Sequence, residues 1–196
     1  MHCSSFILHG QYAQLEPLIQ DHLSDIQAAA ADGELWKLFF TSVPIFEQTQ
    51  QWLDIALELR NQQKAIPFIV RSKSDGKIVG TTRYCNIDQN NKRLEIGYTW
   101  YSQSVQRSAI NTECKLLLLT HAFEVFACNA VEFRTDWFNR KSQAAIERLG
   151  AKRDGVLRNH MILPDGRVRD TVVYSILQNE WPGVKKNLQY MLNMPR

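Results

Sequence analysis

The sequence lacks the cysteine spacing that marks a disulfide framework or a zinc site. Its four cysteines, Cys3, Cys85, Cys114 and Cys128, are widely scattered, and no two of them form a C-x-x-C pair. We therefore expect reduced thiols and no bound metal. The chain also lacks an apolar run of the roughly 18–20 residues that a bilayer span requires, so we expect no membrane partner.

Blocks of like charge are absent as well. The formal net charge is +3, and no block of five or more basic residues occurs. Proteins that bind nucleic acids usually carry a basic patch or stripe, so we expect no nucleic-acid partner, whereas a small anionic ligand stays compatible with the charge. Residues 1–5 show no basic stretch leading into a long apolar one, so we expect no secretory signal and a cytoplasmic protein.

Internal repeats, low-complexity stretches and linkers are also missing from the chain. Its 196 residues suit one domain, since domains usually have about 100–200 residues. A content of 44% hydrophobic and 22% charged residues is ordinary for a globular protein. We therefore expect a single domain over residues 1–196.

The first third of the chain carries mainly helical patterns. We expect a short strand near residues 6–8, followed by helices over residues 21–31 and 47–60. The apolar face of the second helix would consist of residues at helical spacing, namely Trp52, Ile55, Ala56 and Leu59.

From Ile66 onward the pattern changes to strands. The turn signal Ser74-Asp75-Gly76 predicts a hairpin between strands over residues 66–73 and 77–84, because Asp-Gly tolerates positive φ. A third strand over residues 94–101 alternates. One predicted face holds Leu94, Ile96, Tyr98 and Trp100, and the other holds Glu95, Gly97 and Thr99.

The second half of the chain alternates helices and strands. The expected elements are a helix over residues 111–127, a strand over 131–136, a helix over 140–149, strands over 152–162 and 168–177, and a last helix from near Trp181. Asn139 is a plausible N-cap and Gly150 a stop for the second of these helices. This order indicates an α+β fold in which helices flank a mixed, predominantly antiparallel sheet.

A polar segment, residues 101–113, joins the third strand to the long helix. Free backbone N–H groups at a helix start, together with the positive end of the helix dipole, suit a phosphate. Nearly every connection from a strand to a helix has this form, however. By themselves these residues therefore fit a plain connection better than a ligand site.

Three separated motifs follow one another between Ile66 and Leu177. They are residues 94–100 (LEIGYTW), residues 106–124, and residues 139–151 (NRKSQAAIERLGA). Together with residues 155–158 and 169–175, they resemble the GNAT superfamily of N-acetyltransferases. Within it, the likeness is to the branch of the Rim-type ribosomal-protein N-terminal acetyltransferases. This resemblance implies the GNAT fold, with three layers of helices and sheet.

The resemblance implies that acetyl-coenzyme A binds with its pyrophosphate on the junction loop, where the family pattern is Gln/Arg-x-x-Gly-x-Gly/Ala. The matching positions are Gln106, Arg107, Ser108, Ala109, Ile110 and Asn111. Ala109 stands in place of a glycine. That change matters only if the position needs positive φ, where a Cβ costs about 1 kcal/mol. Asn111 departs from the pattern too, and both departures put the coenzyme affinity in doubt.

The resemblance also assigns roles to residues around the thioester. Asn139 and Ser142 match positions that contact the pantetheine arm and the thiol, although by themselves they read as an N-cap and a first-turn residue. A backbone N–H near Thr99 or Trp100 would stabilise the oxyanion. Glu95 is the candidate general base, and the alternative for it is a solvated carboxylate on a half-exposed strand.

Other polar residues are weaker candidates. A lone histidine is more often a satisfied surface or core group than a catalytic one, which applies to His121 and His160. Four charged residues could shape an acceptor pocket, but we expect them to form cross-strand pairs instead; they are Asp136, Arg158, Arg169 and Asp170.

Together these inferences predict an acetyltransferase that transfers the acetyl group directly to a primary amine. An α-amino group, with a pKa of about 7.7–8.0, needs less help to lose its proton at pH 7 than a lysine amine near about 10.4. A peptide N-terminus is therefore mildly preferred, and small metabolites such as polyamines, amino acids or antibiotics stay open. The alternative is a non-catalytic acyl-coenzyme A-binding regulatory module, and a homodimer stays open.

Overall fold

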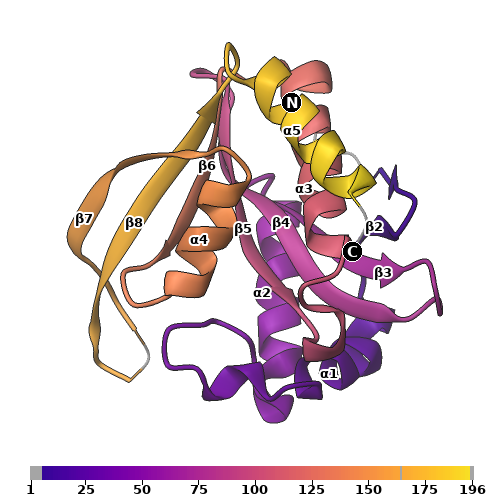
Figure 1. Ribbon diagram of the computed structural model, residues 1–196. Helices are drawn as coiled ribbons and strands as arrows, with labels where there is room; N and C mark the ends of the chain where they lie inside the picture. The colour runs from indigo at the N-terminus through magenta and orange to yellow at the C-terminus, as the bar shows by residue number, and fades with distance from the viewer. Residues whose placement is uncertain (1–5, 164, 195–196) are drawn as a thin grey trace.

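A single eight-stranded sheet organises the protein in the computed structural model, which describes residues 6–163 and 165–194 (Figure 1). The strands are β1 (Leu8–His9), β2 (Ala13–Pro17), β3 (Ile66–Ser72), β4 (Ile78–Asp88), β5 (Arg93–Tyr101), β6 (Ala130–Asp136), β7 (Lys152–Ile162) and β8 (Val168–Leu177). The helices are α1 (Leu23–Ala31), α2 (Thr49–Asn61), α3 (Ile110–Thr120), α4 (Arg140–Arg148) and α5 (Trp181–Asn193). The strand order is β1-β2-β3-β4-β5-β6-β8-β7, and only the β5–β6 pair is parallel.

The predicted α+β class and the predominantly antiparallel sheet are confirmed. Strand β2, which has five residues, ends in proline and pairs with β3, was not predicted. The first strand was predicted near residues 6–8, whereas β1 is Leu8–His9. Short strands carry too few residues for an alternating pattern to stand out, and here pairing with β3 decides the structure.

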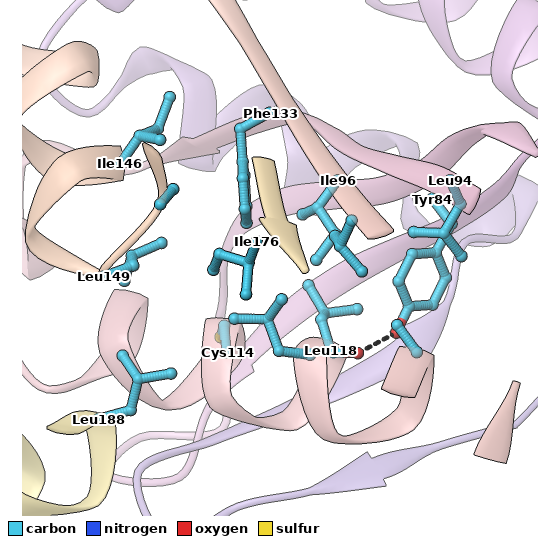
Figure 2. Close-up of a cluster of buried hydrophobic side chains, with 14 of the residues drawn as sticks. Tyr84, Leu94, Ile96, Cys114, Leu118, Phe133, Ile146, Leu149, Ile176 and Leu188 are labelled. Atoms are coloured by element: carbon cyan, nitrogen blue, oxygen red, sulfur yellow. Dashed lines mark hydrogen bonds between the residues drawn. The ribbon is translucent and has the colours of Figure 1, made fainter. Parts of the chain in front are cut away.

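Two apolar cores lie on opposite faces of the sheet. The larger one lies under α3, α4 and α5 (Figure 2), where the Tyr84 hydroxyl donates a hydrogen bond of 2.6 Å to the Leu118 carbonyl. The smaller core lies under α1 and α2 and contains Leu53 and Ala56. The prediction that Ile55 belongs to the apolar face of α2 is wrong, because its side chain is 53% exposed and Leu53 takes the central place.

The long helix was predicted over residues 111–127, but α3 ends at Thr120 and continues as a π-helical turn, His121–Val125. Leu118, Leu119 and Phe123 are buried along it. Among the helices of the described residues, none has both the length and the apolar character needed to cross a membrane.

A β-bulge interrupts the alternation of β5. Thr81 pairs with Trp100 and Arg83 pairs with Gly97, so β5 advances three residues where β4 advances two. The extra residue is Tyr98, whose φ is 51°. Leu94 and Ile96 therefore belong to the larger core, but Trp100 belongs to the smaller one on the opposite face. The predicted common face of Leu94, Ile96, Tyr98 and Trp100 is thus wrong beyond the bulge.

The parallel strands β5 and β6 separate soon after they meet. Their ladder joins residues 93–95 to residues 130–132 and then stops, although β5 continues to Tyr101 and β6 to Asp136. The two halves of the sheet diverge from this point (Figure 1). We call the space between residues 96–101 and residues 133–136 the wedge. The strand edges that face each other across it have no ladder partners.

Candidate functional site

The start of α3 presents unused backbone donors. Its N-cap residue makes no capping hydrogen bond through its side chain. Within the described part of the chain, the N–H groups of Arg107, Ala109, Asn111 and Thr112 donate to no acceptor. The first N–H groups of a helix have no partner inside the helix. They also lie at the positive end of its dipole, so this loop is suited to an anion.

The Ala109 departure from the family glycine pattern costs little in this loop. Ala109 has φ −66°, an ordinary helical value, so its Cβ introduces no backbone strain. The left-handed position is Arg107 instead, with φ 63° and an exposed side chain. The concern that Ala109 weakens the loop therefore loses its basis.

A buried lysine lies at the wedge between β5 and β6. Lys115 is 6% exposed, and its Nζ donates a hydrogen bond of 2.8 Å to Thr99 Oγ1 and lies 5.8 Å from the centre of the Phe133 ring. Burial lowers the pKa of Lys115 to about 8. The sequence analysis missed this residue, and the available signal was a lysine on the buried face of an amphipathic helix.

The start of α4 holds the two other residues that the family resemblance singles out. Asn139 Oδ1 accepts a hydrogen bond of 3.0 Å from the Ser142 backbone N–H, so Asn139 is the N-cap of the helix. The Ser142 side chain is half-buried, and its hydroxyl forms no hydrogen bond within the described residues. The cap is therefore observed, and the hydroxyl keeps its capacity to bind a ligand.

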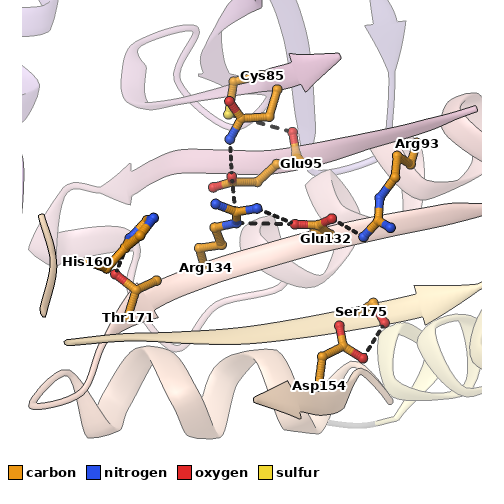
Figure 3. A network of polar contacts seen from close by, with 10 residues as sticks. Cys85, Arg93, Glu95, Glu132, Arg134, Asp154, His160, Thr171 and Ser175 are labelled. Carbon is orange, nitrogen blue, oxygen red and sulfur yellow. Dashed lines mark hydrogen bonds and ion pairs between the residues drawn. The ribbon is translucent and has the colours of Figure 1, made fainter. Parts of the chain in front are cut away.

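Glu95 is the buried end of a network of charges on β5 and β6 (Figure 3). It is 7% exposed, accepts a hydrogen bond of 2.7 Å from Asn86 Nδ2 and lies 3.5 Å from Arg134 Nε. Arg134 also pairs with Glu132, which in turn pairs with Arg93. The alternative of a solvated carboxylate on a half-exposed strand is wrong, because Glu95 is buried.

Burial is also the main influence on the protonation of Glu95. Loss of water raises its pKa, while the Asn86 hydrogen bond and the Arg134 charge oppose that shift. A carboxylate accepts a proton more readily when its pKa moves toward neutral pH. The environment of Glu95 therefore fits a general base.

The remaining charged candidates form ion pairs. Arg158 Nε lies 2.9 Å from Asp170, as the expected cross-strand pairing requires. The buried Asp136 pairs with Arg167 at 2.8 Å, a partner that the sequence analysis missed, and lies 3.9 Å from Arg169.

The two histidines take structural places. His160 Nδ1 lies 3.1 Å from Thr171 Oγ1 (Figure 3). His121 stacks on Phe6 with 4.1 Å between the ring centres, and burial lowers the pKa of His121. Neither histidine contacts the wedge through these partners, which agrees with the weak weight that the sequence analysis gave them.

The cysteines carry no disulfide in the described chain. Cys85, Cys114 and Cys128 are buried thiols outside any disulfide, as expected at these positions, and burial raises the pKa of all three. Cys3 lies outside the described residues.

Comparison with known proteins decides the family. Residues 13–152 match the acetyltransferase (GNAT) domain. The chain belongs to this family of acetyltransferases. The match includes the loop at the start of α3, the wedge and the start of α4, so the three features of the site lie inside the GNAT domain.

Individual relatives agree with this assignment. The chain is 36% identical over 111 residues to the "Putative ribosomal N-acetyltransferase YdaF" of Bacillus subtilis (strain 168), a match that spans 57% of this chain and 60% of that relative. A GCN5-related N-acetyltransferase structure from Brucella melitensis is 31% identical with a TM-score of 0.85, over 96% of this chain and 86% of that one.

A further structure shares the fold at lower identity. Mycobacterium smegmatis RimJ, solved in complex with CoA-disulfide, is 17% identical with a TM-score of 0.81 over 97% of both chains. The expected GNAT resemblance is confirmed by the family match, and the relative named as a ribosomal N-acetyltransferase supports the likeness to the Rim-type branch. The acyltransferase class of enzyme is confirmed at the level of the family.

Proposed function

We propose that the protein transfers the acetyl group of acetyl-coenzyme A directly to a primary amine on a peptide N-terminus or a small metabolite. The observation that carries this proposal is the wedge, because it opens beside the free N–H groups at the start of α3. N–H groups that can bind a phosphate thus lie next to a strand edge whose backbone groups are unpaired. A coenzyme with a pyrophosphate and an amide-containing arm needs both.

The coenzyme would be held by three groups of residues. The backbone from Gln106 to Asn111 would bind the pyrophosphate. The free edge of β5 would bind the amides of the pantetheine arm, since its backbone groups have no ladder partner. Asn139 and Ser142 would contact the arm and the sulfur from the start of α4.

The transfer itself needs a base and an oxyanion site. The amine nitrogen attacks the thioester carbonyl, and its proton passes to Glu95, whose raised pKa suits that task. A backbone N–H near Thr99 or Trp100 stabilises the developing oxyanion. The carbon–sulfur bond then breaks, and the Ser142 hydroxyl donates a hydrogen bond to the departing thiolate. The coenzyme A thiol has a pKa of about 8.5, so a hydrogen bond is enough to stabilise the thiolate and full proton transfer is not needed.

An acidic amine suits this site better than a strongly basic one. Making an α-amino group neutral at pH 7 costs about 1–1.4 kcal/mol, against about 4.6 kcal/mol for a lysine amine. Because the site has one candidate base, the acceptor that costs less free energy to deprotonate is favoured. The relative named as a ribosomal N-acetyltransferase supports a peptide N-terminus.

The test combines binding and turnover. Calorimetry should show that acetyl-coenzyme A binds and that added salt weakens the binding, because part of the attraction is to phosphate. Release of free thiol should then be measured over a panel of peptides with free N-termini, amino acids and polyamines. Failure of acetyl-coenzyme A and coenzyme A to bind at millimolar concentration would refute the proposal.

The non-catalytic alternative makes a different forecast in the same test. A regulatory module would bind acetyl-coenzyme A without accelerating thiol release for any amine. The features that favoured it were Ala109 and Asn111, and the helical φ of −66° at Ala109 removes the first of these. Nucleic acid is not expected to bind, so micromolar affinity for random DNA that falls with salt would contradict the proposed class of acceptor.

A further inference from the structure

Arg83 on β4 is a buried cation held between two aromatic rings. Its side chain lies under α2, and the residue is 3% exposed. The guanidinium carbon is 4.0 Å from the centre of the Tyr98 ring and 5.2 Å from that of Trp52. The rings attract the positive charge but accept no conventional hydrogen bond, so the guanidinium N–H groups still need acceptors.

These N–H groups donate no hydrogen bond to a described residue. The Arg83 side chain has no hydrogen bond and no ion pair among the described residues, and the groups that influence its charge are Tyr98 and Cys85. Neither of those side chains carries a charge at neutral pH. Burial of a cation without a counter-charge is costly. A working protein therefore gains from a ligand that brings an anionic group to this position.

The other arginines near the site are half-buried and differ from Arg83 in having a counter-charge. Arg134 pairs with Glu132, Arg167 pairs with Asp136, and Arg169 lies within ion-pair distance of the same Asp136. Unlike these three arginines, Arg83 has no ion pair with a described residue.

The spacing between Arg83 and Glu95 sets the distance between the two groups of a ligand that would bind both. Arg83 pairs with Gly97 in the β4–β5 ladder, and Glu95 lies two residues from Gly97 on the same face. Diagonal neighbours of this kind have Cα atoms about 7–8 Å apart. A Cβ at Gly97 would lie 2.8 Å from Glu95 Oε1 and 3.3 Å from Cys85 Sγ, so glycine keeps the floor between the two charged groups free.

From this juxtaposition we propose that the acceptor amine carries a carboxylate and that Arg83 binds it. The inference rests on the proposed acetyl transfer and names the acceptor class of the same site. The amine lies toward Glu95, and the carboxylate oxygens accept hydrogen bonds from the guanidinium fork. The carboxylate belongs either to a free amino acid or to an acidic first residue of a peptide.

The experiment compares acceptors that differ in the carboxylate alone. The free amino acid arm pairs alanine with alaninamide, and the peptide arm pairs Asp-Ala-Ala-amide with Asn-Ala-Ala-amide. Values of kcat/KM from thiol release are expressed per neutral amine, so that different amine pKa values do not bias the ratio. The native chain should prefer the carboxylate about tenfold or more in at least one arm. The arm that shows the preference identifies the source of the carboxylate.

The variant Arg83→Gln should bring this ratio close to one. Acetyl-coenzyme A binding, measured by calorimetry, should stay at its native value, because Arg83 faces the acceptor. Arg83→Lys keeps the charge but loses the fork and should give an intermediate ratio; it also serves as the test if the glutamine variant does not fold. The matched control is Arg153→Gln, since Arg153 also stacks on a tryptophan, Trp137, and should keep the native ratio.

Two results would overturn the inference while the proposed function stands. One is turnover with a carboxylate ratio near one in both arms of the native chain. The other is a native preference that Arg83→Gln retains. If no amine is acetylated, the proposed function fails, and the role of Arg83 is then tested by ligand binding alone. The carboxylate acceptors should still raise the Tm of the native chain and not that of Arg83→Gln, and equal shifts would contradict the role of Arg83.

Discussion

Two regions of the molecule bury a glutamate, and they use it in different ways. Glu113 on α3 is 5% exposed, and its carboxylate accepts backbone hydrogen bonds of 2.6, 2.7 and 2.7 Å from Gln11, Tyr12 and Ala13. Glu95 beside the wedge is 7% exposed but accepts one amide hydrogen bond and lies 3.5 Å from an arginine. The Glu113 carboxylate accepts three hydrogen bonds and holds a turn in place. The Glu95 carboxylate accepts fewer hydrogen bonds and keeps lone pairs available for a proton.

Local structure explains this difference. The turn before β2 brings three successive N–H groups to one carboxylate, and Gly10 allows the close approach because a Cβ there would clash with the Glu113 carboxyl. Glu95 instead lies where β5 and β6 stop pairing. Beyond Glu95, the described residues of β5 therefore have no ladder partners on β6, at the position where a ligand would enter.

The largest expected effect is on catalysis, through Glu95→Gln. Loss of a general base usually lowers the rate about 10²–10⁴-fold, and kcat measured by thiol release should fall within that range. The loss should be greatest at low pH, where the acceptor most needs help to lose its proton. An active Glu95→Gln enzyme with a native pH profile would end the distinction between the two glutamates.

The same variant has a signature in stability. Because burial raises the pKa of Glu95 in the folded state, its contribution to stability is fully present below the unfolded pKa and is lost as pH rises through the folded pKa. Glu95→Gln removes this dependence. Relative to the native chain, the variant should therefore gain stability as pH rises through that window, as denaturant titrations at several pH values would show.

The second effect is on folding, through Glu113→Gln. An amide presents one acceptor oxygen to the three N–H groups, so we expect the free energy of unfolding to fall by about 2–4 kcal/mol. Denaturant titration measures it, and kcat per folded molecule should change little. Glu47→Gln at an exposed site is the control and should change stability by less than about 0.5 kcal/mol. A neutral Glu113→Gln would mean that the turn holds without the carboxylate.

Lys115 gives the cationic version of the same comparison. Its pKa is lowered to about 8 by burial, so the folded state disfavours its charge, and its cost to stability fades as pH rises through the folded pKa toward the unfolded one. Lys115→Met should be more stable than the native chain at pH 7, by on the order of 2 kcal/mol. The gap should close between about pH 8 and pH 10. If the difference in stability between Lys115→Met and the native chain does not depend on pH, it arises from side-chain packing and not from the charge of Lys115.

The sequence predicted those features that depend on neighbouring residues. The Ser74-Asp75-Gly76 turn and the N-cap Asn139 are both observed, because each is set within a few residues of chain. The bulge at Tyr98 was missed because it arises from pairing with β4. The setting of Arg83 was missed for the same reason, since Trp52 and Tyr98 reach it from separate elements.

The smallest expected effects separate the two residues at the start of α4. Asn139→Ala removes an observed cap, so we expect a stability loss of about 1 kcal/mol together with weaker coenzyme binding. Calorimetry and thermal unfolding measure both.

Ser142→Ala leaves that cap in place, because Asn139 accepts from the Ser142 backbone and not from its side chain. Its hydroxyl would meet a charged sulfur only as the thioester breaks, so the variant should lower kcat about tenfold while coenzyme affinity stays near the native value. Full kcat over the whole pH range would make Ser142 a first-turn residue alone.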